Sequence, residues 1–164
     1  MALVSIALQK AAPLRTWPAA GKRSGGTNVV QGFELRDVPL PGWTLQAVEA
    51  AGAPGRVRTL RSLWNHGAEG RQEVLSLDVC ECVSVDDARE HVFKLLGAVD
   101  VPLVGRVRGE LAVGDVAFSD PHGYCLLFAV GNVVVLVHAA GRDRAPVTRV
   151  AHSLERHLRR LQRH

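Results

Sequence analysis

The sequence is short of several residue types that mark common functional classes. Aromatic side chains make up 5% of its 164 residues, too few for the stacking platforms on which single-stranded nucleic acids bind. No apolar run approaches the ~20 residues of a membrane-spanning helix, so we expect no membrane span. The three cysteines are too sparse for a disulfide-stapled secreted domain. Reduced thiols are typical of the cytoplasm, and we predict a cytoplasmic location for a soluble protein.

A strong charge of one sign is also missing. The 20 basic residues exceed the 16 acidic residues by four, and both signs are scattered through the chain, which mainly supports solubility. One basic cluster lies near the C-terminus and contains Arg156, Arg159, Arg160 and Arg163. Cations at a helix C-terminus complement the helix dipole. We therefore interpret this electropositive patch as a solvated helix end and do not expect nucleic-acid binding.

The sequence contains no familiar catalytic or cofactor motif. It has no G-x-S-x-G elbow and no H-E-x-x-H pair, and Gly105–Gly109 lacks the pattern of a phosphate-binding loop. Residues 119–124 bring Ser119, Asp120 and His122 close together, but Asp-Pro followed by Gly is what a hairpin turn needs. We interpret this segment as a turn, and we predict no catalytic residue, no metal site and no cofactor.

The most apolar part of the chain is residues 124–139, which predict two strands joined by a Gly131-Asn132 turn. A glycine at the first central position suits a type II′ hairpin. Both strands are apolar on both faces, which is typical of strands covered on both sides. We therefore expect this hairpin to form the centre of a sheet.

Two amphipathic helices accompany the predicted sheet. Ser84 can cap the first, with Asp87 in the capping-box position, and the second runs from about Pro146 to about Leu161. The other strand candidates are residues 33–38, 43–51, 57–64, 71–83, 105–109 and 115–119. This order predicts an α+β fold, a mainly antiparallel sheet with two amphipathic helices packed on one face.

The N-terminal part differs in composition from the rest. Residues 11–28 are rich in proline and glycine and predict a linker, so we expect an arm and linker over 1–28 and a single domain over 29–164. The arm carries the apolar residues Leu3, Val4, Ile6 and Leu8, which have no place in the predicted core. Since an extended apolar segment can add a strand to another sheet, we predict a non-enzymatic accessory or interaction domain. It would bind a protein partner or larger assembly through this arm or through a sheet edge.

An alternative function stays open for one face of the strand over 71–83. Asp78, Cys80 and Cys82 point to the same side of that strand, and His122 or His138 could lie nearby. This face could bind a small ligand or carry out catalysis. The Cys80-Glu-Cys82 spacing differs from that of zinc knuckles, and cysteine commonly serves as a small buried hydrophobe. Two neighbouring thiols could nevertheless form a disulfide-reactive pair under oxidation.

Two segments carry a family resemblance. One is Pro39-Leu-Pro-Gly-Trp43 at the opening of a strand; the other is Val113-Gly-Asp-Val-Ala-Phe118, followed by Gly131-Asn-Val-Val-Val135 and a closing amphipathic helix. Over residues 33–161 this pattern resembles small bacterial α+β domains of the PsbP-like kind, which include mycobacterial lipoproteins of the LpqN type. The resemblance implies an accessory or ligand-sensing domain without catalytic residues. In contrast to those families, we expect no secretion signal and no lipidation cysteine near the start of this chain.

Overall fold

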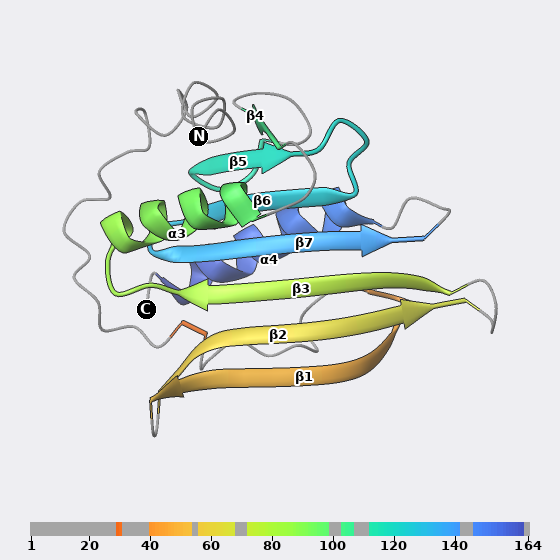
Figure 1. The fold of residues 1–164 in the computed structure, drawn as a ribbon. Coiled ribbons are helices and arrows are strands. Elements are labelled where there is room, and N and C mark those ends of the chain that lie inside the picture. The colour runs from red at the N-terminus through yellow and green to blue at the C-terminus, as the bar shows by residue number, and fades with distance from the viewer. Residues whose placement is uncertain are drawn as a thin grey trace.

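The computed structural model describes residues 29–30, 40–53, 56–67, 72–98, 103–106, 112–141 and 146–162. Within these ranges, seven strands form one sheet in the order β1-β2-β3-β7-β6-β5-β4, and all neighbouring strands are antiparallel (Figure 1). With two helices, this arrangement confirms the α+β class and the antiparallel sheet. The elements are β1 (Thr44–Ala53), β2 (Arg56–His66), β3 (Glu73–Glu81), α3 (Val85–Ala98), β4 (Val104–Arg106), β5 (Val116–Ser119), β6 (Cys125–Val130), β7 (Val133–Ala140) and α4 (Val147–Leu161).

The β6–β7 hairpin lies at the centre of the sheet, as its composition predicts. β7 is the fourth of the seven strands and β6 pairs with it, and every residue of β6 is buried. Gly131 has a φ of 57°, and no described residue other than glycine has a positive φ. A positive φ at Gly131 followed by a negative φ at Asn132 is the combination that a type II′ turn requires.

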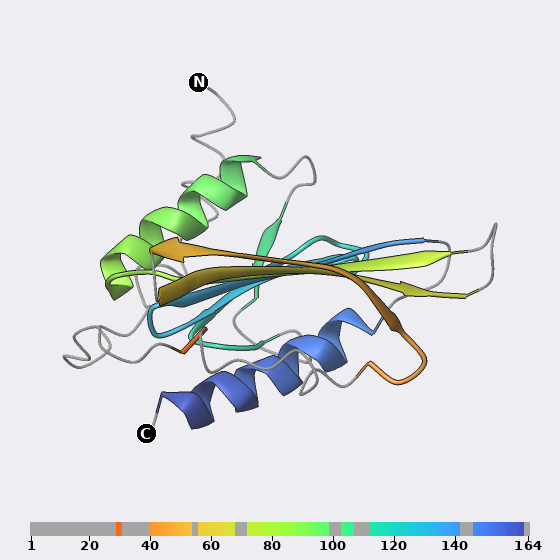
Figure 2. The same ribbon diagram turned by 90° about the horizontal axis from the view of Figure 1, so that it is seen from below.

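The two helices lie on opposite faces of this sheet. α4 packs with Phe128 and Val135 in one buried cluster, whereas α3 packs with Leu127 and Val134 in another. Because successive strand residues point to opposite faces, these clusters belong to opposite sides of the sheet, and Figure 2 shows the helices there. The prediction that both helices pack on one face is therefore wrong. Strands that are apolar on both faces need a cover on each.

Local signals place both helices correctly along the chain. The Ser84 hydroxyl oxygen accepts the Asp87 backbone N–H at 3.0 Å and donates its own proton to the Asp87 carboxylate at 2.7 Å, which confirms Ser84 as the N-cap of α3. α4 buries the face that its spacing predicts, made of Val147, Val150, Ala151, Leu154 and Leu158.

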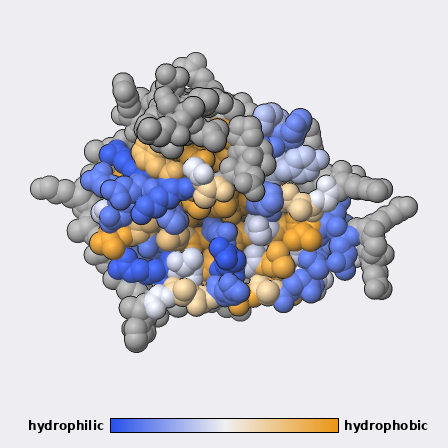
Figure 3. Space-filling view, in the orientation of Figure 1, coloured by the Kyte–Doolittle hydropathy of each residue, from blue (hydrophilic) through white to orange (hydrophobic). Residues whose placement is uncertain are grey.

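The sheet is covered unevenly. Among the described elements, α3 makes its main contacts with β6 and β7, so β1 and β2 lie outside its cover. Figure 3 views the side on which α3 lies and shows hydrophobic surface interrupted by hydrophilic side chains. All described side chains of β1 are exposed. This half of the sheet is thus the open half of the molecule.

The N-terminal boundary and the first strand candidate fall mostly outside the described residues. Val29 and Val30 are buried, each 2% exposed, in the cluster that contains α4, and the Val30 N–H donates to the buried Glu81 carboxylate at 3.2 Å. The arm and linker over 1–28 and the candidate strand over 33–38 lie outside the described residues. The division into arm and domain stays a prediction.

The glycine before β5 provides a test of this packing. Gly114 has a φ of 69°, and a Cβ there would lie 2.3 Å from the Ala129 carbonyl oxygen. Gly114→Ala should lower the free energy of unfolding by about 1–3 kcal/mol from the strained φ alone, and the backbone clash should add to this loss. Gly97→Ala is the matched control, since a Cβ at Gly97 meets nothing within 4 Å and alanine favours the helix by up to ~1 kcal/mol. Urea unfolding of both variants checks this, and equal stabilities would contradict the close approach.

Candidate functional site

Three of the residues that sequence reasoning grouped do share one face of the sheet. Asp78 and Cys80 lie on β3, with Cys82 directly after its end, and alternate with the buried Leu77, Val79 and Glu81. They point to the side on which α3 lies, because the buried residues between them pack toward α4. This face is the candidate site.

Asp78 already forms an ion pair with Arg61 on this face. Its carboxylate accepts a hydrogen bond from the Arg61 guanidinium at 2.6 Å, and the two residues face each other in the β2–β3 register. The Asp78 carboxylate raises the pKa of Arg61 through this hydrogen bond. The Arg61 side chain is 64% exposed and that of Asp78 29%, so the pair adds little to stability. Its main effect on the site is to neutralise the Asp78 charge.

The two thiols are free, half-buried and close to each other. The Thr59 hydroxyl donates to Cys80 Sγ across the β2–β3 pair, with an Oγ1–Sγ distance of 3.9 Å. A hydrogen bond from Cys82, together with smaller effects of His91, Thr59 and Arg58, lowers the pKa of Cys80 to about 6 against the opposing effect of burial. The same hydrogen bond raises the pKa of Cys82, and burial and the Cys80 charge raise it further. The arrangement holds a thiolate at Cys80 beside a protonated thiol at Cys82.

The structure adds three residues that sequence reasoning did not connect with the thiols. Thr59 reaches Cys80 because the two residues are register partners, which the sequence of either strand does not reveal. His91 lies on α3 three residues after the buried Ala88, so helical spacing puts it beside the apolar stripe. Arg58 lies on β2, one residue before Thr59, and is half-buried.

The two histidines do not join this site. His138 faces Ser76 in the β3–β7 register, four residues along β3 from Cys80, which is about 13 Å at ~3.3 Å per residue. His122 is exposed in the turn between β5 and β6. The sequence grouping of Asp78, Cys80 and Cys82 with these histidines therefore joins residues that lie in separate parts of the fold.

The segment that resembles a triad is a turn, as we interpreted it. Asp120 is 2% exposed, and its carboxylate oxygens accept the backbone N–H groups of His122 at 2.9 Å and Cys125 at 2.7 Å. A carboxylate that accepts backbone donors in this way stabilises a tight turn. Burial raises the pKa of the third cysteine, Cys125, to about 11, and this thiol packs in the cluster under α3.

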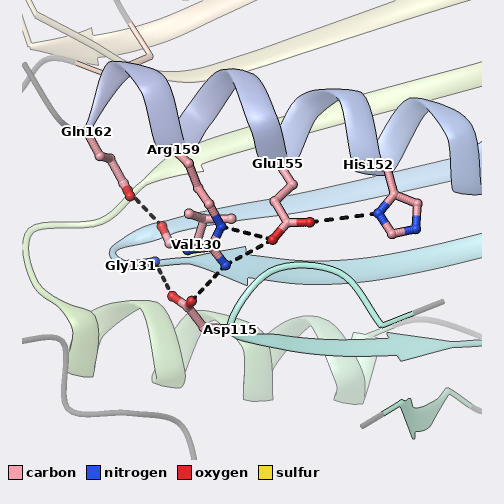
Figure 4. A network of polar contacts seen from close by, with 7 residues as sticks. All are labelled: Asp115, Val130, Gly131, His152, Glu155, Arg159 and Gln162. Atoms are coloured by element: carbon pink, nitrogen blue, oxygen red, sulfur yellow. Dashed lines mark hydrogen bonds and ion pairs between the residues drawn. The ribbon is translucent and has the colours of Figure 1, made fainter. Parts of the chain in front are cut away.

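The predicted electropositive patch is smaller than the sequence indicated. Arg156 and Arg160 are exposed, but Arg159 binds the Asp115 carboxylate at 3.1 Å and the Glu155 carboxylate at 2.9 Å (Figure 4). These contacts tie α4 to the start of β5, so Arg159 has a structural role. Arg163 and the arm residues Leu3, Val4, Ile6 and Leu8 lie outside the described residues.

The same network holds the central hairpin turn. The second oxygen of the Asp115 carboxylate accepts the Gly131 N–H at 2.7 Å, and the Gln162 amide donates to the Val130 carbonyl at 2.9 Å (Figure 4).

Within the described ranges, no group of three or more His, Cys, Asp and Glu side chains is placed to hold a metal ion. None of the described helices is long and apolar enough to cross a membrane. Comparisons with protein-family models, curated proteins and solved structures give no match.

The turn at Asp120 gives a prediction that tests whether Asp120 has a structural role in the turn rather than a catalytic role. Asp120→Ala leaves two backbone donors without their acceptors and should lower the free energy of unfolding by about 2–4 kcal/mol, at ~1–2 per donor. His122→Ala should change it by less than about 0.5 kcal/mol, since the side chain is exposed. Urea unfolding measures both. A tolerated Asp120→Ala would refute the structural assignment.

Proposed function

We propose that this protein is a non-enzymatic interaction domain that binds a protein partner at the exposed edge of β1. The observation that carries the proposal is a ten-residue edge strand, Thr44–Ala53, whose described side chains are all exposed. An edge strand presents unpaired backbone N–H and C=O groups on one side. An extended segment of a partner can pair with these groups and add a strand to the sheet.

The composition of β1 supports this proposal. Natural edges are usually protected by lysine, proline or shortness, yet β1 has a single charged residue, Glu49, and no proline. Its register with β2 shifts at Gln46 and between Ala51 and Gly52, so Ala47–Ala51 pairs regularly in between. The opposite edge, β4, has three residues. Of the two sheet edges, β1 is the one long enough to hold a partner strand.

Both faces beside this edge offer apolar contacts to an added strand. On the α4 side, Leu45 is 39% exposed and Val48 47% exposed. On the other side, Leu63 of β2 is 38% exposed and faces Ala47. Specificity in strand addition comes from contacts of alternate side chains with such neighbours. The partner segment we propose is therefore extended and apolar.

Three further parts of the proposal rest on the sequence alone: the N-terminal arm, the family resemblance and the location. The N-terminal arm is a second candidate element for partner binding. The resemblance to PsbP-like bacterial accessory domains fits a protein that works through a partner, and a cytoplasmic location fits the free thiols. Small-ligand binding or catalysis at the Asp78–Cys82 face has one favourable observation, the two half-buried free thiols on that face.

The test compares edge, arm and control variants of the full-length chain. Lysines replace Val48 and Ala50 together on the edge, or Ile6 in the arm, and Phe93→Lys is the control because Phe93 is 37% exposed on α3. Partners captured from native lysate with nuclease present are identified and their affinities measured with purified components. The edge variant should bind at least tenfold more weakly, about 1.4 kcal/mol, while the control binds normally.

Each of the other outcomes decides against the binding of a different protein at the β1 edge. Loss of binding only with Ile6→Lys assigns the interaction to the arm, and equal binding by all three variants refutes both surfaces. If the chain captures only itself, the edge pairs two copies and no other partner is involved. Far-UV circular dichroism of every variant establishes that the fold is retained.

A further inference from the structure

The interaction proposed for β1 leaves without a role the thiol pair on the side of the sheet on which α3 lies, where Cys82 packs against the α3 cluster. Cys80 and Cys82 are both half-buried rather than enclosed, they lie two residues apart on one side of the strand, and Thr59 donates to Cys80 at 3.9 Å. We propose that they form a thiol–disulfide exchange site, in which Cys80 attacks a small anionic disulfide and Cys82 resolves the resulting mixed disulfide.

The surroundings of Cys80 favour its thiolate, which is the attacking species in exchange. Its sulfur accepts a hydrogen bond from Thr59 at 3.9 Å. The neighbouring Cys82 lowers the pKa of Cys80 to about 6, with smaller contributions from His91, Thr59 and Arg58. At neutral pH most Cys80 is therefore ionised, whereas an ordinary thiol with a pKa near 8.5 is ionised to a few per cent.

Cys82 is placed to act second. While Cys80 is a thiolate, its charge and hydrogen bond keep Cys82 protonated. Once Cys80 enters a mixed disulfide that negative charge disappears, so Cys82 loses its proton more easily, against the remaining effects of burial and Asp87. In the reduced protein Cys80 is therefore the attacking thiol, and in the mixed disulfide Cys82 becomes the attacking thiol. This change of roles requires no movement of the sheet.

The exchange of electrons and protons is balanced, and the small disulfide is the only oxidant that it needs. The Cys80 thiolate forms a bond to one sulfur of glutathione disulfide, whose S–S bond breaks, and the departing thiolate takes a proton from water. Cys82 gives its proton to solvent and attacks Cys80 Sγ, which forms the Cys80–Cys82 disulfide and releases the second glutathione. The protein dithiol loses two electrons, and glutathione disulfide gains them as two thiols.

Charge favours a disulfide that carries carboxylates. Arg58 lies near both thiols, and Asp78, the carboxylate on the same face of β3, is neutralised by Arg61 at 2.6 Å. The Asp87 charge also acts on Cys82, but Cys80 makes the first attack. Glutathione disulfide is therefore the probe, and cystamine, which carries amines instead, is its counterpart of opposite charge.

The protein disulfide should form reversibly. Two residues apart on an extended strand, the Cα atoms are separated by about 6.6 Å, near the upper limit of ~6.8 Å for a disulfide. A disulfide at that limit is strained, and strained disulfides are readily reduced. The site is suited to exchange rather than to a permanent cross-link.

The experiment exposes the reduced full-length chain, freed of reductant, to glutathione disulfide and follows its mass. The native protein should lose two hydrogens, with the new disulfide mapped to Cys80 and Cys82, and dithiothreitol should reverse this. Cys82→Ser should retain one glutathione on Cys80, Cys80→Ser should react at least ~10-fold more slowly, and Cys125→Ser should behave as native. Preferential reaction of Cys82, or Cys80 reacting no faster than the buried Cys125, would overturn the proposal.

Two further measurements distinguish attack by an activated Cys80 thiolate from a reaction that depends only on the exposure of the thiols. The rate of glutathione release should rise through an inflection near pH 6, and Thr59→Val or His91→Gln should move that inflection upward. Arg58→Gln should slow the reaction with glutathione disulfide several-fold more than the reaction with cystamine. An inflection above pH 8 in the native protein would exclude Cys80 as an activated thiolate, and equal slowing with both disulfides would exclude selection by Arg58.

Discussion

The need to shield the β6–β7 hairpin from water on both faces governs the described structure. Phe128 and Val135 point toward α4, while Leu127 and Val134 point toward α3. Burial of each such side chain contributes about 1.5–3 kcal/mol, so the loss of either helix would expose several of them. A helix on each face and a sheet between them meet this requirement, and the strands farther from the hairpin are left with thinner cover.

The hairpin turn also fixes the backbone beside the two thiols. Asn132 accepts the Cys82 N–H at 2.9 Å through its carbonyl, and its side-chain amide donates to the Cys82 carbonyl at 2.7 Å. Asp115 holds Gly131 from the other side at 2.7 Å. The backbone at the end of β3 is therefore fixed by the centre of the sheet. A Cys80–Cys82 disulfide would have to form against these bonds, which adds to the strain expected from the strand geometry.

Local patterns predicted what depends on neighbours in sequence, and they failed for what depends on tertiary pairing. Ser84 and Asp87 mark the start of α3, and Gly131 marks the hairpin, because each requirement is met within a few residues. The faces covered by the helices could have been inferred from the hairpin's two apolar faces, although the order of elements suggested otherwise. The contact of Thr59 with Cys80 and that of Asp115 with Arg159, 44 residues apart, depend on register and packing that no local spacing encodes.

The two proposed activities occupy neighbouring parts of the sheet, but they do not overlap. Ala51 of β1 faces Thr59 of β2, which faces Cys80 of β3. At about 4.8 Å between adjacent strands, Cys80 lies ~10 Å inside the β1 edge and a partner strand would lie ~14 Å from it. Such a strand pairs with backbone groups in the plane of the sheet, whereas a disulfide approaches the thiols from above the face. Because two strands separate the sites, oxidation of the thiols can influence partner binding only by changing the twist or register of β2 and β3.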